Sequence, residues 1–463
     1  MHFHLMGIGG AGVSALARLL RQRGYDVSGC DAQNSPEIEK LIAEGFLIDI
    51  GHHPNHISTE TDALVISTAI AQSHPEVVQA KNKNISVRYR IEVLGDLLRE
   101  TEASIGVIGT HGKTTTSSMI AATLLAAQLD PTALIGSNVH ELSNSNMRLG
   151  SGPFVAELDE SDPRFQWAVP RLAVLTNLEA DHIGRPGDLR PNFSWTSFAE
   201  LREAVRGFLS RTEKVVYCAD WPGLASLCEQ TQTAISYGMC DSADYCAHDF
   251  EMDGLGSAFT VRRGTDTLGK VKLNIPGKYN ALNALAAIAV ADLLNADLNK
   301  VFMALEHFRG ASRRFEFKGS ANGAWVVDDY AHHPTEISAV LEAAKASGRT
   351  LKVVFQPHRF LRTAQTWEAS ADALMSADHV YIVDIYGAGE RPIEGIDARN
   401  IVQRMIENGH RSCHYTADLP GTLRALVPDL SERDLVLTIG AGDITQLGGQ
   451  LIGVSQQHDR LAT

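Results

Sequence analysis

The stretch FHLMGIGGAG (residues 3–12) decides the expected fold, because an apolar run leads directly into a glycine-rich turn and then into a helical pattern. The turn matches G-x-G-x-x-G through Gly7, Gly9 and Gly12. In such a turn, backbone N–H groups and the helix dipole bind a diphosphate. Asp31 ends the next predicted strand, where an acidic side chain can hold a ribose hydroxyl or a base. The alternative is a glycine turn that only lets helix and strand pack closely.

A second glycine turn follows another predicted strand, in IGVIGTHGKTTT (residues 105–116). Val107 stands where a strict Walker A pattern has glycine, but the core G-K-T at residues 112–114 is present. The backbone amides of such a turn cradle phosphate, Lys113 reaches the β and γ phosphates, and the Thr114 hydroxyl binds Mg²⁺. The sequence therefore predicts two phosphate-binding turns in separate domains, and an ordinary NAD dehydrogenase has no use for the second.

Strand-like apolar runs alternate with amphipathic helical patterns from end to end, which is typical of an α/β protein. The predicted strands are Phe3–Met6, Val27–Gly29, Leu64–Ser67, Ile105–Ile108, Phe154–Glu157, Val174–Asn177, Val215–Cys218, Val326–Asp328, Lys352–Phe355, Val380–Asp384 and Leu435–Thr438. The predicted helices include Val13–Arg23, Thr115–Ala127, Asn283–Leu294 and Thr335–Ala344. Several strands are apolar on both faces, as in a parallel sheet covered by helices.

Three domains are expected, because the chain has 463 residues and a domain has about 150. Gly440–Gly442 is a third glycine turn, and each of the three could be the first βα turn of a separate doubly wound unit. We expect an N-terminal Rossmann-like domain over 1–100, a central P-loop-type domain over 101–310 and a C-terminal Rossmann-like domain over 311–463.

The composition narrows the function further. Lys plus Arg number 41 and Asp plus Glu 55, so the net charge is −14. A surface that acidic argues against nucleic acid or an anionic membrane as a partner. The six cysteines include no C-x-x-C pair, which argues against zinc or redox motifs and fits a reducing cytosol. With no signal peptide and no apolar run of about 20 residues, we expect a cytoplasmic protein.

Acidic and basic side chains at predicted strand ends mark further candidates. Glu157 is a candidate Mg²⁺ ligand, although its acidic segment could equally be a solvated loop or a helix cap. His182 is unusual near Mg²⁺, and a lone histidine is more often structural. Arg359 and Arg362 share a helical face and suit a carboxylate or phosphate, unless they are a surface pair neutralised by acids.

Taken together, the ordered motifs resemble the Mur ligase family nearly from end to end. The motifs are M-G-I-G-G-A-G-V-S, G-T-H-G-K-T-T-T, A-E-L-D-E-S-D, T-N-L-E-A-D-H, N-A-L-N-A-L-A-A, R-R-F, D-D-Y-A-H-H-P-T-E and Q-P-H-R-F-L-R-T. Within the family, the branch that adds L-alanine is the most similar. The resemblance implies a UDP-sugar domain, a central ATPase domain and a C-terminal domain that brings the amino acid. It also implies that the first turn binds the diphosphate of UDP rather than NAD.

The resemblance assigns roles to residues of this sequence. It implies that the UDP-sugar contacts Gly7, Gly9, Gly10, Ala11, Gly12, Asp31 and Ser67. It implies that ATP contacts Gly109, Thr110, His111, Gly112, Lys113, Thr114 and Thr115, with Asn280 at the adenine and Asp329 at the ribose. Thr114 would bind one Mg²⁺, and Glu157 with His182 would bind a second. Arg314 would reach phosphate across the domain boundary. Tyr330, His332, Arg359 and Arg362 would surround the amino acid and the muramoyl carboxylate.

The sequence departs from the family pattern at a few places. Tyr279 precedes Asn280 where family members commonly have histidine, and tyrosine can still stack on adenine. The segment after His182 looks longer than the usual turn, and we assign it no role. Many members carry a carbamylated lysine downstream of this histidine. No lysine lies between His182 and Lys214, so no such modification is predicted.

The implied reaction is ATP-dependent joining of L-alanine to the lactoyl carboxylate of UDP-N-acetylmuramate through an acyl phosphate, with Lys113, Arg314 and His332 as catalytic residues. The expected partners are UDP-N-acetylmuramate, L-alanine and ATP, with Mg²⁺, in a monomer or weak homodimer. The nearest alternative is a ligase that attaches a recycled tripeptide to the same sugar. More distant alternatives are an NAD-linked oxidoreductase with a regulatory P-loop domain and a nucleotide-binding regulatory protein without catalysis.

Overall fold

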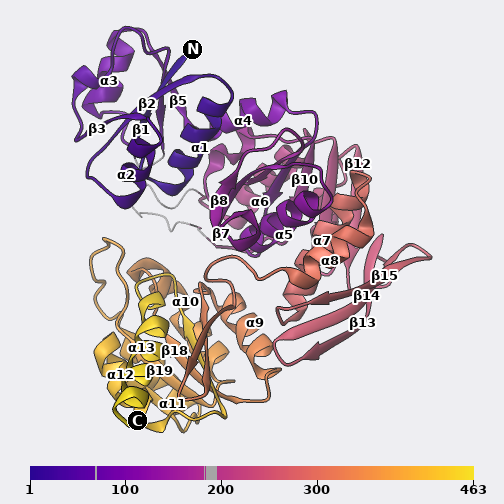
Figure 1. Ribbon diagram of the computed structural model, residues 1–463, viewed down its shortest axis with the longest axis vertical. Coiled ribbons are helices and arrows are strands. Elements are labelled where there is room, and N and C mark those ends of the chain that lie inside the picture. The colour runs from indigo at the N-terminus through magenta and orange to yellow at the C-terminus, as the bar shows by residue number, and fades with distance from the viewer. Residues whose placement is uncertain (68–69, 182, 184–194, 463) are drawn as a thin grey trace. The chain divides into compact units, whose positions relative to one another are not determined.

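The computed structural model describes residues 1–67, 70–181, 183 and 195–462 (Figure 1). The chain forms two compact units. One contains Met1–Cys246, Arg262–Leu268 and Leu282–Ala304, and the other contains Ala247–Val261, Gly269–Ala281 and Leu305–Thr463. Three β-sheets with flanking helices are distributed over these units, as expected for three doubly wound domains. The predicted boundaries near residues 100 and 310 stay a prediction.

The first sheet is parallel, with strand order β3-β2-β1-β4-β5. Its strands are β1 His2–Met6, β2 Asp26–Asp31, β3 Leu47–Ile50, β4 Ala63–Ile66 and β5 Ser86–Tyr89. Its helices are α1 Ala11–Gln22, α2 Pro36–Ala43, α3 Pro75–Asn82 and α4 Arg90–Glu100, with a short 3-10 helix η1 Pro54–His56. The strand order reverses between β1 and β4, and ligands bind at such a switch point. The predicted glycine turn follows β1 at this place.

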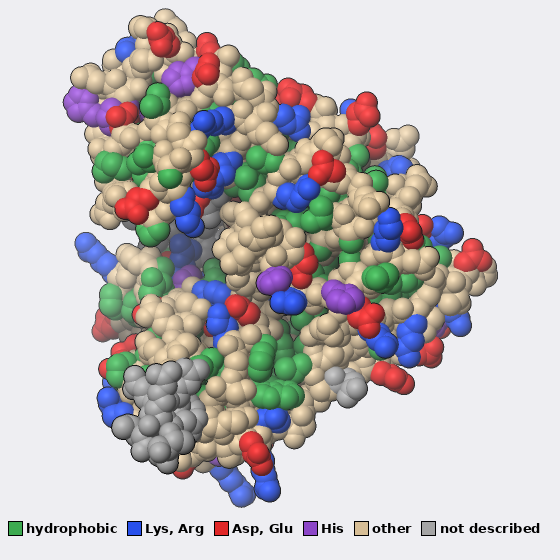
Figure 2. Space-filling view, in the orientation of Figure 1, with side chains coloured by type: hydrophobic (Ala, Val, Ile, Leu, Met, Phe, Trp, Pro, Cys, Tyr) green, Lys and Arg blue, Asp and Glu red, His purple; other side chains and the backbone are tan. Residues whose placement is uncertain are grey.

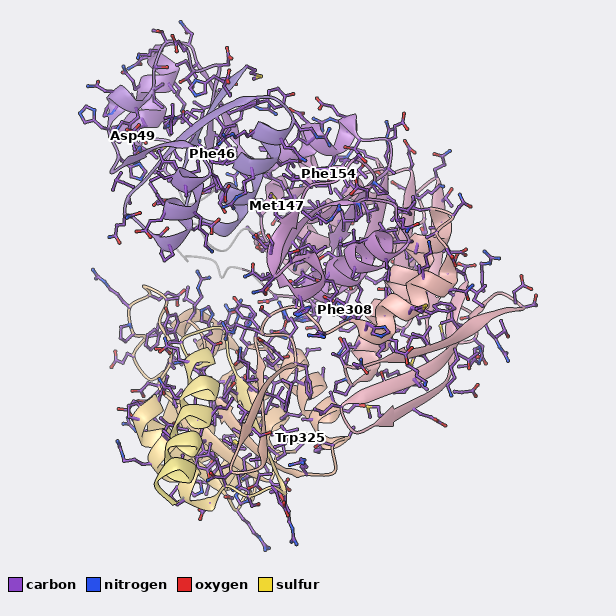
Figure 3. The ribbon with its side chains drawn as sticks, in the orientation of Figure 1. Phe46, Asp49, Met147, Phe154, Phe308 and Trp325 are labelled. Carbon is purple, nitrogen blue, oxygen red and sulfur yellow. The ribbon has the colours of Figure 1, made fainter. Side chains whose placement is uncertain are left out.

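The second sheet has ten strands in the order β15-β14-β13-β12-β11-β10-β6-β9-β7-β8. They are β6 Ser104–Ile108, β7 Thr132–Val139, β8 Ser145–Arg148, β9 Phe154–Glu157, β10 Leu172–Leu175, β11 Lys214–Cys218, β12 Thr233–Gly238, β13 Tyr245–Asp253, β14 Gly256–Arg263 and β15 Asp266–Leu273. The helices are α5 Lys113–Ala126, α6 Phe198–Leu209, α7 Lys278–Leu293 and α8 Leu298–His307, and the 3-10 segments are η2 His140–Leu142, η3 Pro163–Trp167 and η4 Ala225–Leu227. Phe154 on β9 is fully buried in the core of this sheet (Figure 3).

Two features of this part differ from the prediction. The alternation of strands and helices was expected throughout, but Tyr245–Leu273 forms three consecutive strands, β13–β15. Strands that are neighbours in the sheet and joined by two-residue links run antiparallel. The predicted strand Val174–Asn177 is also displaced, because β10 ends at Leu175 and the side chains of Thr176 and Asn177 bind the backbone of His111 instead.

The third sheet has the order β16-β17-β21-β18-β19-β20 and is parallel apart from the edge pair β16–β17. Its strands are β16 Glu316–Ala321, β17 Ala324–Asp329, β18 Thr350–Phe355, β19 His379–Val383, β20 Cys413–Ala417 and β21 Asp434–Ile439. Its helices are α9 Pro334–Lys345, α10 Phe360–Leu374, α11 Ala398–Glu407, α12 Leu419–Leu426 and α13 Thr445–Ala462, with η5 Val427–Asp429. The turn Gly440–Gly442 follows β21, the last strand, so it is not the first βα turn of its unit.

On the face shown in Figure 2, acidic and basic side chains are interspersed and neither sign forms a continuous patch. Within the described ranges, no helix combines the length and apolarity that crossing a membrane requires.

Candidate active site

The second glycine turn joins β6 to α5 at the centre of the large sheet. Gly109 has φ +136° and Gly112 has φ +78°, and both values favour glycine. A Cβ on Gly112 would lie 2.9 Å from Asn283 Oδ1, so the left-handed turn also has no room for a side chain. Gly112 is the N-cap of α5, whose first N–H groups have no partner within the helix. This is the geometry that binds a phosphate.

The turn is held by the segment that follows β10, the strand on one side of β6. Asn177 Oδ1 accepts a hydrogen bond from the His111 backbone N at 2.7 Å, and Asn177 Nδ2 donates to the His111 carbonyl at 2.9 Å. The backbone N of Glu179 donates to Thr110 Oγ1 at 2.9 Å, and a Glu179 carboxylate oxygen lies 2.9 Å from His111 Nε2. Thr110 and His111 are therefore fixed by contacts from the segment that follows β10.

Lys113 is partly buried beside a carboxylate that the sequence analysis did not select. Its Nζ donates to Glu160 Oε2 at 2.8 Å and to the Gly109 carbonyl at 2.6 Å. Burial alone would lower the pKa of Lys113, but the charges of Glu160 and Asp159 outweigh it and raise this pKa. Burial raises the pKa of Glu160 to about 7 against the opposing charge of Lys113. The indole Nε1 of Trp195 donates to the Glu160 carbonyl at 2.8 Å.

On the other side of β6, the predicted magnesium ligands Thr114 and Glu157 lie together. Thr114 Oγ1 donates to Glu157 Oε1 at 2.9 Å, and the Gly136 backbone N donates to Glu157 Oε2 at 2.7 Å. A hydroxyl and a carboxylate that converge in this way provide the oxygen ligands that Mg²⁺ prefers. These two residues therefore fit the ion. The third predicted ligand, His182, lies outside the described residues.

Sequence reasoning missed three residues that shape this site: Glu160, Asn177 and Asn283. Glu160 and Asn177 lie in the quoted acidic motifs, but only the path of the loops after β9 and β10 shows which side chain turns towards the P-loop. Asn283 accepts a hydrogen bond from Thr116 Oγ1 at 3.0 Å and belongs to α7, far away in sequence. Its position in N-A-L-N-A-L was the available signal.

The first glycine turn also has an internal support. The Gly9 backbone N donates to Asp31 Oδ2 at 2.9 Å, so Asp31 ties the turn to the end of β2. A Cβ on Gly9 would lie 2.9 Å from Ile38 Cγ1, and one on Gly12 would lie 3.2 Å from Arg90 Nη1. These glycines are thus needed for packing, as one of the two interpretations in the sequence analysis has it, and binding of a diphosphate at this turn stays a prediction.

The remaining residues of the first site cluster at the same sheet edge. Helix α1 begins at Ala11 with Gly10 as its N-cap, and Gly7 has φ +69°. Ser67 directly follows β4, the strand across the switch point from the turn. Arg90 was not selected from the sequence, yet its guanidinium lies against Gly12. It places a partly buried positive charge next to the proposed diphosphate turn.

In the third sheet, aromatic and basic side chains gather at the carboxyl end of β17. The guanidinium carbons of Arg313 and Arg314 lie 5.0 and 5.1 Å from the centre of the Tyr330 ring. Tyr330 meets His332 edge-on, with ring centres 5.3 Å apart. His332 Nδ1 lies 3.0 Å from the Tyr330 carbonyl oxygen, which can only accept, so Nδ1 carries the proton in this bond and Nε2 is the basic nitrogen.

The predicted arginines follow β18, the strand next to the central strand β21. Arg359 has φ +66°, a backbone conformation that residues other than glycine rarely adopt. Such backbone strain is concentrated at functional sites. Its Nε lies 3.8 Å from Glu390 Oε1. Arg362 Nη1 lies 3.3 Å from His358 Nδ1. A small cavity is lined by His332, Phe355, Pro357, His358, Arg362 and Trp367, so the structure brings His332 and Arg362 together.

Asp329 and Asn280 belong to the same compact unit as these residues. Asp329 is buried, and its two carboxylate oxygens accept hydrogen bonds from the backbone N of Phe315 and of Ala331, both at 2.7 Å. Burial raises the pKa of Asp329 to about 6, although the charge of Arg314 opposes the shift. Asn280 Nδ2 donates to the Pro276 carbonyl at 2.7 Å in the first turn of α7. Their assignment to ATP stays a prediction.

Comparison with known proteins gives a consistent result over the whole chain. Residues 2–102 match the model "Mur ligase family, catalytic domain", 107–291 match "Mur ligase middle domain", and 313–442 match "Mur ligase, glutamate ligase domain". A protein of Deinococcus radiodurans named UDP-N-acetylmuramate–L-alanine ligase is 44% identical over 98% of this chain and 94% of its own length. One of the same name from Solibacter usitatus is 40% identical over 97% of this chain and 94% of its own.

Solved structures agree with these relatives. The UDP-N-acetylmuramate-alanine ligase of Thermotoga maritima has a TM-score of 0.80 at 29% identity and covers 99% of this chain and all of its own. A murein peptide ligase of Psychrobacter arcticus has a TM-score of 0.66 at 24% identity and covers 98% of both chains, which shows a shared fold.

Proposed function

This chain belongs to the Mur ligase family, and on that basis we propose that it joins L-alanine to the lactoyl carboxylate of UDP-N-acetylmuramate at the expense of ATP, in peptidoglycan synthesis. The Deinococcus relative that carries the name of this activity is 44% identical to the chain. Membership of a ligase family excludes the alternative of an NAD-linked oxidoreductase with a regulatory P-loop.

The observation that carries the proposal is the P-loop with its two carboxylates. Lys113 projects from the first position of α5 towards Glu160, and Thr114 projects towards Glu157. Both lie beside backbone N–H groups at a helix N-terminus, where phosphate oxygens bind. Phosphoryl transfer needs groups that hold phosphate and neutralise its charge. The lysine, the hydroxyl and the carboxylates at this end of the P-loop are groups of that kind.

The chemistry follows from the inertness of a carboxylate towards amines. The lactoyl carboxylate oxygen attacks the γ phosphorus of ATP, ADP leaves, and the acyl phosphate has a leaving group that a carboxylate lacks. The amine then attacks the carbonyl carbon, and the tetrahedral intermediate expels phosphate. The chain contributes positioning and charge neutralisation, for which Lys113 and Arg314 are the proposed residues.

Magnesium is the proposed cofactor, held by Thr114 and Glu157 together with His182. When bound, the ion would neutralise phosphate charge and orient the oxygens of ATP. The residues present in the structure fit this role through their oxygen atoms, as described above.

The amine must lose its proton before it attacks. His332 is the proposed acceptor, because its Nδ1 donates to the Tyr330 carbonyl and leaves Nε2 basic. Arg359 and Arg362 are proposed to bind carboxylates, and Tyr330 to close the pocket against His332.

The test is an assay of phosphate release with the purified chain, ATP, Mg²⁺ and UDP-N-acetylmuramate. L-alanine is compared with the tripeptide L-Ala-γ-D-Glu-diaminopimelate, and product masses are recorded for both. The proposal expects turnover with L-alanine and weaker turnover with glycine and L-serine, because a pocket separates such small differences by only ~10–200-fold. A clear preference for the tripeptide would replace the alanine assignment with the recycling ligase and leave the family intact.

A further inference from the structure

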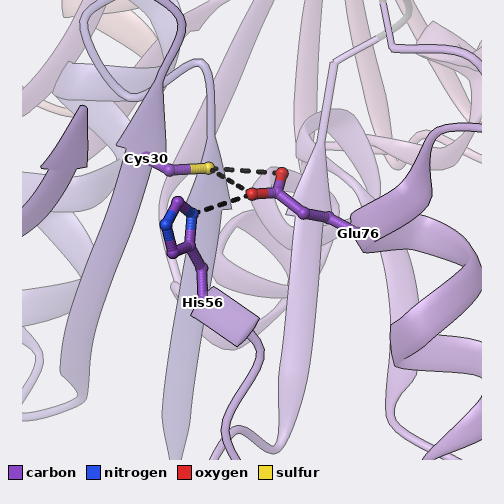
Figure 4. Close-up of side chains that lie close together, drawn as sticks. All are labelled: Cys30, His56 and Glu76. Carbon is purple, nitrogen blue, oxygen red and sulfur yellow. Dashed lines mark hydrogen bonds and ion pairs between the residues drawn. The ribbon is translucent and has the colours of Figure 1, made fainter. Parts of the chain in front are cut away.

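A buried carboxylate in the first domain is surrounded by histidine nitrogens and a cysteine sulfur rather than by lysine or arginine side chains. Glu76, near the start of α3, is fully buried. Cys30 at the end of β2 and His56 of η1 lie against its carboxylate (Figure 4). Within the described part of the chain, Glu76 forms ion pairs with histidines only, at His52, His56 and His74.

The distances between these atoms match those between neighbouring ligands of a metal ion. Cys30 Sγ lies 3.5 Å from His52 Nδ1 and 3.4 Å from Glu76 Oε2, and His52 Nδ1 lies 3.1 Å from the same oxygen. In a tetrahedral zinc site, bonds of about 2.0–2.3 Å put neighbouring ligand atoms about 3.3–3.6 Å apart. The triangle of sulfur, nitrogen and oxygen therefore has nearly the size of one face of that tetrahedron.

His56 is the fourth candidate ligand and contacts the other carboxylate oxygen of Glu76. His56 Nδ1 lies 2.9 Å from Glu76 Oε1, and the donor atoms of Cys30, His56 and Glu76 all lie within 4.8 Å of one another. His74 is less suited, because its Nδ1 accepts a hydrogen bond from the Glu76 backbone N and so caps α3. The backbone N of His53 donates to Glu76 Oε1 at 2.9 Å and fixes the carboxylate, as supporting groups do around metal ligands.

A second observation concerns the interior next to this cluster. His4 of β1 pairs with Ser28 of β2, and Cys30 lies two residues further along β2, so His4 and Cys30 point to the same face of the sheet. His4 is 1% exposed, and within the described residues its Nε2 has no hydrogen-bond partner. An unpartnered buried nitrogen is costly and indicates that a bound water or ion belongs nearby.

We infer that Cys30, His52, His56 and Glu76 bind a divalent transition metal ion of the zinc type. Thiolate, imidazole and carboxylate ligands select zinc or a similar ion, whereas Mg²⁺ prefers oxygen alone. One thiolate and one carboxylate carry two negative charges, which a divalent cation neutralises inside the domain. With four protein ligands the site is closed, as structural zinc sites are, and it joins β2, η1 and α3 next to the turn formed by Gly9 and Asp31.

The experiment measures metal binding by the full chain after treatment with a chelator. Co²⁺ is titrated in excess Mg²⁺ and without nucleotide, because tetrahedral Co²⁺ bound to a thiolate absorbs visibly and in the near ultraviolet. Wild type is compared with Cys30→Ser and His56→Gln, and Cys413→Ser is the matched control, since Cys413 is another buried free thiol in a different domain.

We expect one equivalent of Co²⁺ with a thiolate band in wild type and in Cys413→Ser, displaced by Zn²⁺. The band should be absent in Cys30→Ser, and the affinity of His56→Gln should fall at least about tenfold, which equals about 1.4 kcal/mol. Zn²⁺ should raise the melting temperature of wild type and leave that of Cys30→Ser unchanged. A folded wild-type chain without the band, or the same band in Cys30→Ser, would overturn the inference.

Discussion

At the scale of single residues, Lys113 is the clearest target. Lys113→Ala removes the charge that the proposed mechanism places on the transferring phosphoryl group, and losses of such stabilisation cost on the order of 10²–10³ in rate. The fold should survive, because the pKa of Glu160 is already raised to about 7 by burial, and this carboxyl can take up a proton when its partner is lost.

The measurement is steady-state phosphate release, with circular dichroism to confirm folding. Lys214→Ala serves as the control, because Lys214 is an exposed lysine at the start of β11. Turnover of Lys113→Ala close to that of the control would contradict the assignment of the P-loop.

Arg359 and Arg362 carry a second prediction at this scale. A guanidinium binds a carboxylate with two parallel hydrogen bonds, and lysine cannot reproduce that geometry. Arg359→Lys or Arg362→Lys should raise the KM for L-alanine about tenfold or more, since a hydrogen bond to a charged group contributes roughly 1.5–3 kcal/mol. The KM for ATP should change much less. Equal effects on both constants would show that these side chains do not discriminate between the two substrates.

Residue types at strand ends were enough to predict part of the site. Glu157 ends β9 and Thr114 is the second residue of α5, and in the structure Thr114 Oγ1 and Glu157 Oε1 lie 2.9 Å apart. Glu160 is only three residues further on, yet its contact with Lys113 depends on the path of the loop after β9. No spacing in the sequence encodes that path, so the partner of Lys113 could not be chosen in advance.

At the scale of elements, two helical glycines form a matched pair. Gly95 in α4 is buried, and a Cβ there would lie 3.1 Å from Ala168 Cα and even closer to the Trp167 carbonyl. Gly207 in α6 is exposed, with nothing within 4 Å of its Cβ position. Gly95→Ala should lower the free energy of unfolding by about 1–3 kcal/mol through overpacking. Gly207→Ala should raise it by up to about 1 kcal/mol, because alanine favours helix. Urea unfolding of both variants measures these free energies. Changes of the same sign in both variants would contradict the close packing of α4 at Gly95.

The elements that sequence patterns predicted best are the buried central strands. Phe154–Glu157 is confirmed residue for residue as β9, because a continuous apolar run in a covered parallel sheet has no competing interpretation. Edge strands such as β3, whose side chains are largely exposed, carry no such signal. The strands β13–β15 were missed because their polar alternation belongs to antiparallel pairing, which a search for βα units does not detect.

At the scale of the whole molecule, His358 makes stability depend on pH. Burial, and then the charges of His332 and Arg362, lower the pKa of His358 from 6.5 to about 3. The unfolded chain therefore takes up this proton first as the pH falls below 6.5, and stability is lost between that pH and about 3. Between pH 7 and 5 the loss should be about 1 kcal/mol, after allowance for solvent screening of a partly exposed ring.

The check compares denaturation midpoints of wild type and His358→Gln at both pH values. Asp329 acts in the opposite direction, because its pKa is raised to about 6 and the folded chain takes up its proton first. That contribution is common to both proteins, so the difference in slope isolates His358. Parallel pH profiles would show that the histidine is not kept neutral by the fold.

The three-sheet architecture could be predicted because a glycine-rich turn after a strand occurs once in the sequence of each sheet. The turns at Gly7 and Gly109 each follow the first strand of a sheet, as expected. The turn at Gly440 follows the last strand of its sheet. The prediction that it is the first βα turn of its unit was therefore wrong, although the local pattern is the same. A glycine-rich turn in the sequence indicates that a strand is followed by a helix, but it does not indicate the position of that strand in the sheet.

The contact between Trp195 and Glu160 makes the fluorescence of this tryptophan a probe of the P-loop. The indole is 3% exposed, and it donates to the backbone of the residue whose carboxylate holds Lys113. A nucleotide that draws Lys113 away from Glu160 changes the dipoles around this indole, and indole emission responds to such changes. The chain has five tryptophans, so Trp195→Phe identifies the responding one. Loading of the phosphate cradle should therefore be visible as a change of intrinsic fluorescence, in real time and without a coupled enzyme.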